Sequence, residues 1–146
     1  ITMIMCDYCA LRPQQRKQLL QKFHNLLNPE GSILLDVYTL ESFAQRKEQA
    51  IYELNLLNGF WSPEDYYGFL NTFKYYKEKV ILDKYTIIEK TRNKEIYNWL
   101  QYFSKDSLIT EFKNNKFINI EVFADVAGSK IKPGNPEMAI VAKKAE

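Results

Sequence analysis

The chain has 146 residues, of which 46% are hydrophobic and 26% charged, a composition typical of a folded domain with one sizeable core. Twenty Lys and Arg against eighteen Asp and Glu leave a formal net charge of +2, which is too small to indicate a nucleic-acid partner. No apolar run reaches the roughly 20 residues that span a bilayer, and no signal peptide is recognisable. The sequence therefore predicts a cytoplasmic protein without a membrane or nucleic-acid partner.

The N-terminal third of the chain predicts two buried strands joined by a helix. Residues 1–6 are a short apolar run, typical of a buried strand. Pro13 suits the first position of a helix, and leucines then recur at helical spacing. Gly31 is expected to turn the chain, and residues 32–38 are again nearly continuously apolar. Such a pattern predicts a βαβ unit with parallel strands.

The rest of the chain is richer in aromatic and β-branched residues. Residues 40–54 carry a patchy apolar face that favours a helix. Ser104 can cap a helix that carries Leu108 and Phe112. Five segments are predicted as strands, the first three forming an antiparallel meander: residues 66–76, 79–90, 94–103, 117–126 and 137–144. The predicted order of elements is thus β-α-β-α-βββ-α-β-β.

Several segments resemble class I S-adenosylmethionine-dependent methyltransferases, in matching order along nearly the whole chain. Residues 3–11 resemble the fourth strand of that family with its following loop, and residues 26–37 resemble the turn into the fifth strand. Residues 96–104 are similar to the end of an insert found in a small-molecule subgroup. Asn115-Lys116-Phe117 looks like the entry to the sixth strand, with Lys116 in place of Gly, and residues 137–144 look like the seventh strand.

The resemblance implies an α/β fold: the last strands of a Rossmann-like methyltransferase sheet with an inserted antiparallel three-strand meander. We expect one domain over residues 1–146, with the insert at residues 60–103. The implied activity is transfer of a methyl group from S-adenosylmethionine to a small-molecule acceptor in the full-length protein. The family's glycine-rich cofactor loop has no counterpart, because the chain has five glycines and no G-x-G.

The N-terminal end of the chain leads to a further expectation. The chain opens on an apolar run, whereas domains rarely begin inside a buried strand. We expect a fragment, the C-terminal half of the methyltransferase domain, that binds cofactor weakly or not at all and is inactive alone. Residues 1–6 would then form an unpaired apolar edge, which predicts a dimer or larger homo-oligomer through this first strand.

Ligands of open α/β sheets bind outside the carboxyl ends of the parallel strands, here at residues 6–12 and 36–40. In the resembled family the first of these loops lies beside the methionine part of the cofactor, so Asp7 and Tyr8 are candidates for cofactor binding. Tyr38, in the second loop, is a candidate for substrate binding. A turn cap at Asp7 and simple packing of Tyr8 remain open, and no catalytic base can be named.

Most aromatic residues of the chain lie between residues 60 and 103. They form either an aromatic-lined substrate wall or the core of the insert itself. Trp61, Tyr97 and Trp99 are the candidates for the substrate wall, because their polar tips suit a half-wet site. The same aromatic segment allows an alternative function, a non-enzymatic module that encloses a small apolar ligand.

Cys6 and Cys9 have the C-x-x-C spacing of a redox dithiol, which is a third hypothesis. A working dithiol needs its first thiol at a helix N-terminus, where the helix dipole lowers the thiol pKa, and Cys9 instead stands four residues before Pro13. A zinc site would require two more ligands, and His24 is the only histidine. We therefore predict no metal.

Overall fold

The computed structural model describes residues 1–145, which form two compact units. Unit 1 comprises residues 1–45 together with the chain from residue 101 onward, and unit 2 comprises residues 46–100. Unit 2 is therefore a continuous segment that interrupts the sequence of unit 1. Within residues 1–145, no helix is long and apolar enough to cross a membrane.

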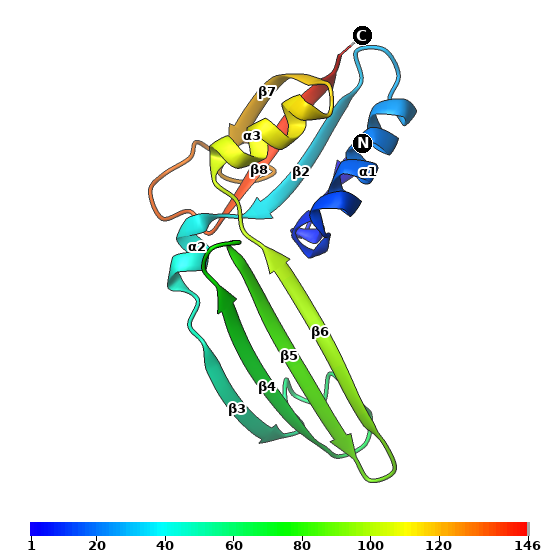
Figure 1. Cartoon of the computed structure of the whole chain (residues 1–146), viewed down its shortest axis with the longest axis vertical. Helices are drawn as coiled ribbons and strands as arrows, with labels where there is room; N and C mark the ends of the chain where they lie inside the picture. Colours follow the sequence, from blue (N-terminus) through cyan, green and yellow to red (C-terminus); the bar gives the residue numbers. More distant parts are fainter. Residues whose placement is uncertain (146) are drawn as a thin grey trace. The chain divides into compact units, whose positions relative to one another are not determined.

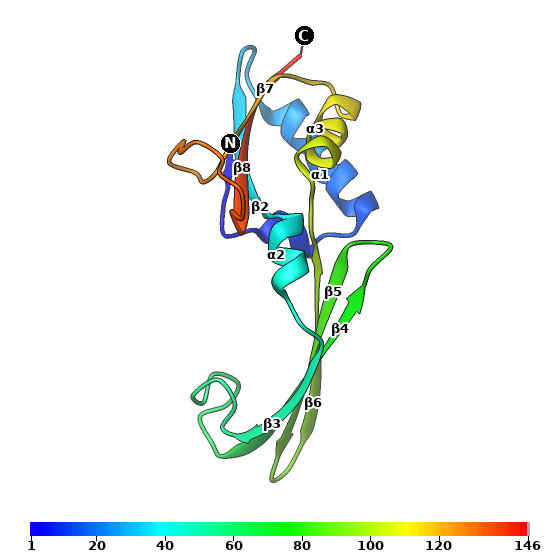
Figure 2. The ribbon, with the colours of Figure 1, turned by 90° about the vertical axis from the view of Figure 1, so that its left-hand side faces the viewer.

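Unit 1 is a four-stranded sheet in the order β1-β2-β8-β7, and the helices α1 and α3 lie on one face of it (Figures 1 and 2). Fully buried aliphatic side chains of β2 and β8, such as Leu35 and Ile140, form the centre of its core. The elements of this unit are β1 (Thr2–Met3), η1 (Asp7–Ala10), α1 (Pro13–Leu26), β2 (Ser32–Tyr38), α2 (Leu40–Gln45), α3 (Lys105–Asn114), β7 (Phe117–Phe123) and β8 (Glu137–Lys144).

The predicted βαβ unit is confirmed. Strands β1 and β2 pair in parallel, with Thr2 opposite Leu34, and α1 connects them. Strand β1 is shorter than the predicted residues 1–6, because Met5 and Cys6 adopt positive φ values of 72° and 57° and end the extended run. Strand β1 is also an edge of the described sheet.

The turn before β2 forms in a different way from the one predicted. Glu30 adopts the left-handed conformation, with φ of 62°, so Gly31 is not the residue that turns the chain. Gly31 is instead required by close packing, because a Cβ atom there would lie 2.8 Å from the carbonyl oxygen of Asn28. Lys116, at the entry to β7, likewise adopts a positive φ of 64° although it is not a glycine.

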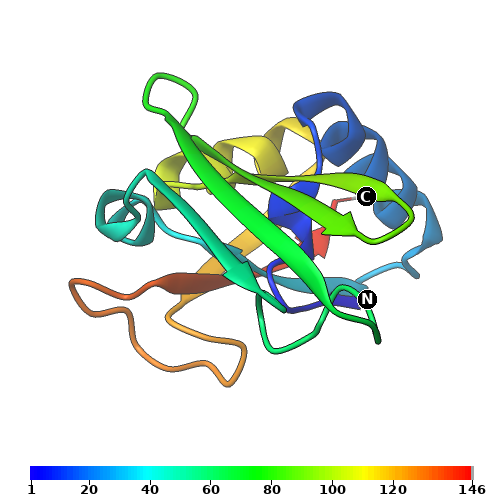
Figure 3. The ribbon, with the colours of Figure 1, turned by 90° about the horizontal axis from the view of Figure 1, so that it is seen from below.

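Unit 2 is a four-stranded sheet in the order β3-β4-β5-β6, in which β4 pairs antiparallel with both β3 and β5 (Figures 1 and 3). The strands are β3 (Gln49–Leu54), β4 (Tyr66–Tyr75), β5 (Val80–Glu89) and β6 (Asn93–Gln101). The predicted three-strand meander is present as β4, β5 and β6. The predicted helix over residues 40–54 is wrong in its second half, because α2 ends at Gln45 and β3 pairs with the whole central part of β4.

One face of the unit 2 sheet carries a small core. Leu56, Tyr66, Leu70 and Ile87 are buried there, and Trp61, Tyr85 and Ile96 pack against them. Gly68 of β4 makes room for the loop that covers this face, since a Cβ atom at Gly68 would approach Leu56 to 2.4 Å.

Candidate functional site

A buried carboxylate fixes the turn at the carboxyl end of β1. Asp36, near the end of β2, is 8% exposed and accepts hydrogen bonds from the backbone N–H groups of Met5 at 3.2 Å and Cys6 at 2.8 Å. These are the two residues with positive φ. Charge-assisted hydrogen bonds of this kind stabilise a conformation that non-glycine residues otherwise avoid, so Asp36 sets the path of the chain into η1.

Both cysteines are buried and are free thiols, and Cys6 lies beside this carboxylate. The sulfur of Cys9 accepts a hydrogen bond from the backbone N–H of Tyr38 at 3.3 Å. A hydrogen bond with Cys9, together with burial, raises the pKa of the Cys6 thiol far above its ordinary range. A redox dithiol needs a lowered pKa and an accessible thiolate. This environment therefore disfavours the redox hypothesis and leaves the cysteines a packing role.

Glu137 brings a second carboxylate to the same place. It is the first residue of β8 and lies opposite Tyr38 across the β2–β8 ladder. The potential ligand atoms of Cys6, Asp36 and Glu137 all lie within 4.8 Å of one another. Burial raises the pKa of the Tyr38 phenol, and the neighbouring Cys6 and Glu137 act in the same direction. Sequence reasoning missed Glu137, because only the pairing of two strands that are distant in sequence places it here.

Glu137 also lines a cavity of about 180 Å³. Its walls come from Thr39 and the start of α2, the start of α3, the start of β8 and the loop before β8, which includes Lys132 and Asn135. The hydroxyl of Thr39 donates a hydrogen bond to the backbone oxygen of Asn135 at 2.6 Å and so ties this loop to β2. The cavity is therefore a preformed, mainly apolar hollow lined by two carboxylates, Glu41 and Glu137, of which Glu137 also belongs to the cluster with Cys6 and Asp36.

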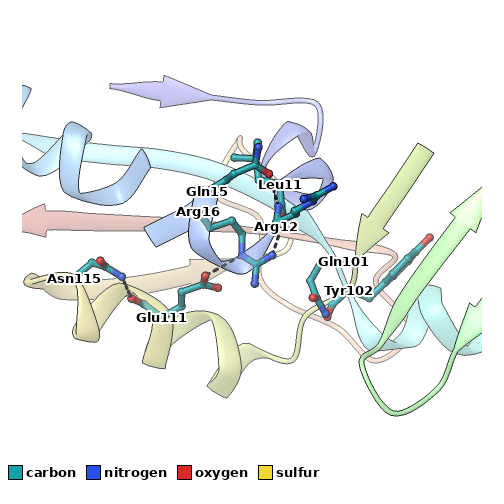
Figure 4. Close-up of polar contacts among 8 residues, drawn as sticks. All are labelled: Leu11, Arg12, Gln15, Arg16, Gln101, Tyr102, Glu111 and Asn115. Atoms are coloured by element: carbon teal, nitrogen blue, oxygen red, sulfur yellow. Dashed lines mark hydrogen bonds and ion pairs between the residues drawn. The ribbon is translucent and has the colours of Figure 1, made fainter. Parts of the chain in front are cut away.

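A buried arginine braces the segment that carries the candidate cofactor residues (Figure 4). Arg16 of α1 is 6% exposed, and its guanidinium donates hydrogen bonds to Glu111 of α3 at 2.8 Å and to the backbone oxygen of Leu11 at 2.7 Å. The same guanidinium lies over the rings of Phe103, at 5.1 Å, and Tyr8, at 5.8 Å. Arg16 thus joins α1, α3 and the end of η1.

The two candidate cofactor residues lie side by side in η1 but face different surroundings. Asp7 is exposed in the first turn. Tyr8 is fully buried, with ring centroids 5.9 Å from Phe103 and 6.4 Å from Phe112. Burial raises the pKa of its phenol, and the neighbouring Glu111 acts in the same direction. Cofactor contacts of both residues stay predictions, and in this structure Asp7 alone offers a surface for them.

The four candidate substrate residues are divided between the two units, and the three of unit 2 do not share one face of its sheet. Tyr38 lies in unit 1 and stacks on Tyr102 at 5.5 Å. Trp61 packs on Tyr85, at 4.9 Å, on the core face of the unit 2 sheet. Tyr97 and Trp99 alternate with Ile96 along β6 and therefore lie on the opposite face, exposed by 50% and 43%. Their substrate contacts stay predictions, but Trp61 cannot share a face of this sheet with the other two.

Comparison with known proteins finds likeness in structure but not in sequence. No family model matches the chain, and no curated protein sequence matches it. Several solved structures match over 99–100% of the chain. Among them are an S-adenosylmethionine-dependent methyltransferase from Clostridium acetobutylicum (TM-score 0.72, 9% identity), the CcbJ methyltransferase from Streptomyces caelestis (0.68, 11%) and the sugar N-methyltransferase KedS8 from Streptoalloteichus (0.60, 10%).

These matches show the fold. The predicted fold class, a Rossmann-like methyltransferase sheet interrupted by an antiparallel insert, is confirmed, with four strands in the insert instead of three. The chain spans 58%, 56% and 56% of the lengths of the three matched chains.

Proposed function

We propose that the chain is part of an S-adenosylmethionine-dependent methyltransferase that acts on a small-molecule acceptor. The observation that supports this function most is the match of the whole chain to a methyltransferase structure with a TM-score of 0.72. The cluster of Cys6, Asp36 and Glu137 and the cavity lie at the carboxyl end of the parallel strands, where ligands bind in open α/β sheets. Fold and site position thus support the same activity.

The residues present fit one part of the cofactor. Asp7, exposed after the first parallel strand, can accept hydrogen bonds from an amino group. The chain has no pair of closely spaced glycines at which the backbone could approach the cofactor. When bound, S-adenosylmethionine supplies a methyl group carried on a sulfonium. In this proposal the chain itself contributes Asp7 to cofactor binding and the cavity beside Glu137 to acceptor binding.

The cavity that we propose for the methyl acceptor also carries a group that can remove a proton from it. Methyl transfer requires alignment of the acceptor and, for many acceptors, removal of a proton. Glu137 lines the cavity and is exposed, so its carboxylate is the proton acceptor that we assign. Asp36 is not available for this role, because it holds the backbone N–H groups of Met5 and Cys6. Asp36 is a positioning residue.

Calorimetry with S-adenosylhomocysteine tests the proposed cofactor. A longer protein that contains the chain should bind this ligand, and the chain alone should bind it at least about tenfold more weakly, because one or more contacts worth about 1.4 kcal/mol are missing. The variant Asp7→Asn should weaken binding, whereas Asp106→Asn, at an acidic residue in α3, should not. Absence of binding by the longer protein would contradict the proposal.

The role of Glu137 is tested in the longer protein, by measuring its transfer of labelled methyl groups to a panel of small amines and alcohols. We expect Glu137→Gln to lower the rate about 10²–10⁴-fold, the usual contribution of a general base, while S-adenosylhomocysteine affinity stays the same. Glu41→Gln, at another carboxylate lining the cavity, is the matched control. An unchanged rate in Glu137→Gln would exclude Glu137 as the proton acceptor and leave the methyltransferase proposal standing.

A further inference from the structure

Four charged side chains line the cavity of unit 1, two of each sign. The cations are Lys105 and Lys132, and the anions are Glu41 and Glu137. Among residues 1–145, none of the four side chains forms an ion pair or a hydrogen bond, so their charges stay uncompensated around the hollow. Opposite charges that line one cavity without pairing with each other are available to a ligand that carries both signs.

Glu137 is the carboxylate suited to a positive group of such a ligand. One of its carboxylate oxygens lies within 4.8 Å of an oxygen of Asp36, which is 8% exposed. Two carboxylates this close reinforce one another's negative potential. Asp36 is committed to the backbone N–H groups of Met5 and Cys6. An ammonium group beside Glu137 is therefore attracted by both carboxylates, and Glu137 is the one that can accept its hydrogen bond.

Lys105 and Lys132 are suited to a negative group of the ligand. Lys105 is the first residue of α3, and the N-terminal end of a helix carries a partial positive charge of its own. Lys132 lies in the loop before β8, where its backbone N–H donates a hydrogen bond to Oδ1 of Asn135 at 2.7 Å. Thr39 holds the same Asn135 through its backbone oxygen. Both backbone positions are thus fixed, and an anionic group in the cavity faces two lysines.

Ligands of other classes leave part of this charge unmatched. A simple amine leaves Lys105 and Lys132 without a partner, and a simple acid is repelled by Glu41 and Glu137. The cavity of about 180 Å³ is also smaller than the about 300–1,000 Å³ typical of sites for drug-sized ligands. A small molecule that carries one amine and one acid group is therefore the class that fits.

We propose that the cavity selects an amino acid, a small zwitterion with one amine and one carboxylate, as the methyl acceptor; this inference rests on the proposed function. Lys105 and Lys132 bind the carboxylate of the acceptor and determine specificity. Glu137 binds the ammonium group and takes up one of its protons, which leaves the nitrogen with a free electron pair. The amino acid thus matches charges of both signs, which no simple amine or alcohol does.

NMR titration of the chain with three ligands of one carbon skeleton tests the ligand class. The ligands are β-alanine, propylamine and propionate, and the reporters are the backbone signals of Thr39, Lys132 and Asn135. We expect β-alanine to bind about tenfold more tightly than the other two, because each of them lacks one charged partner. The longer 4-aminobutyrate and 5-aminopentanoate cover wider separations of the two charges. Equal affinity of propylamine and of every amino acid would overturn the proposal, and so would tighter binding of 2-aminoethyl phosphate.

Two exposed lysines can be replaced without opening the core. Lys105→Met and Lys132→Met should each lower the affinity for the preferred amino acid toward that of propylamine, and the affinity for propylamine itself should not fall. Lys130→Met, at an exposed residue of the same loop that does not line the cavity, is the matched control and should behave as the unchanged chain. A variant that weakens both ligands alike would assign the lysines a structural role and overturn the proposal.

Methylation by the longer protein separates this inference from the proposed function. We expect kcat/KM for the preferred amino acid to exceed that for propylamine about tenfold, and Lys132→Met to remove this difference. A longer protein that binds S-adenosylhomocysteine and methylates both acceptors equally well would overturn the inference and leave the proposed function standing. A longer protein that does not bind S-adenosylhomocysteine would contradict the proposed function, whatever the chain binds in its cavity.

Discussion

Unit 1 and unit 2 are both built on four-stranded sheets, yet they bury their apolar side chains to different extents. In unit 1, α1 and α3 cover one face of the sheet, and residues such as Leu35, Leu108 and Ile140 have no exposed surface. In unit 2, one face carries a small core and the other exposes side chains such as Tyr67, Tyr97 and Trp99. Helices that pack on a sheet enclose a large apolar core, whereas the helix-free sheet of unit 2 has only a loop to cover its core face.

The chain carries separate reporters for the two units. Every helix of the described residues lies in unit 1, so circular dichroism at 222 nm follows that unit. Both tryptophans, Trp61 and Trp99, lie in unit 2, so tryptophan fluorescence follows the other. Urea unfolding monitored by both signals therefore tests whether the two units unfold together or separately.

The largest expected effect comes from Arg16→Ala in unit 1. Removing one partner of a buried ion pair leaves Glu111 uncompensated and costs about 3–5 kcal/mol of unfolding free energy. Lys17→Ala, at an exposed position of the same helix, should change the stability by less than about 0.5 kcal/mol. We expect the 222 nm transition to move to lower urea. A loss below about 1 kcal/mol would show that the arginine is not a brace of unit 1.

In unit 2, Gly68→Ala should cost about 1–3 kcal/mol, because the added methyl group overpacks against Leu56. The tryptophan transition reports this loss. The double variant Leu56→Ala/Gly68→Ala provides the control, since removing the Leu56 side chain makes room for the methyl group. Its total loss should be smaller than the sum of the two single losses, and strictly additive losses would contradict the predicted clash.

Ser104→Ala tests the N-terminus of α3 in unit 1. The Ser104 side chain accepts a hydrogen bond from the backbone N–H of Ser107 at 3.0 Å, and loss of such a cap costs about 1 kcal/mol. Ser104→Asp keeps a capping oxygen and should retain nearly all of the stability. Equal losses in both variants, measured at 222 nm, would mean that the cap does not limit the stability of this helix.

The smallest effect is expected for an ion pair of unit 2. Arg92 and then Ser62, through hydrogen bonds, lower the pKa of Glu89 to about 2. A carboxyl group with a lowered pKa stabilises the folded state above its ordinary pKa of 4.5, and this contribution is lost as the pH falls toward 2. NMR titration of Glu89 checks the value, and Glu89→Gln should make stability less dependent on pH within that window. A titration midpoint near 4.5 would contradict it.

The sequence predicted most of the elements because their signals are local. Residues 32–38 form a buried strand with the predicted bounds, and Pro13 begins α1 as expected. Residues 49–54 were predicted as helix because Ala50, Ile51 and Leu54 continue an apolar spacing from α2. Every residue of β3 is exposed, so pairing with β4, and not burial of a periodic face, determines its structure.

The candidate site was less predictable, because its parts meet only in the folded chain. The position of Asp7 and Tyr38 near the carboxyl ends of the parallel strands follows from the predicted topology. Glu137 follows from the pairing of β2 with β8, which no local pattern specifies. Trp61 was predicted beside Tyr97 and Trp99 from its residue type, but the loop that carries it folds onto the other face of the sheet.

Two backbone hydrogen bonds in unit 1 join the segment that precedes residues 46–100 to the segment that follows them. Phe103 donates to the backbone oxygen of Tyr38 at 2.9 Å, and Leu40 donates to that of Phe103 at 3.1 Å. A long excursion between anchored ends adds little closure entropy, since this cost grows only with the logarithm of loop length. The architecture is thus modular, and the intervening segment can lengthen, shorten or be exchanged by recombination while the anchoring framework is retained.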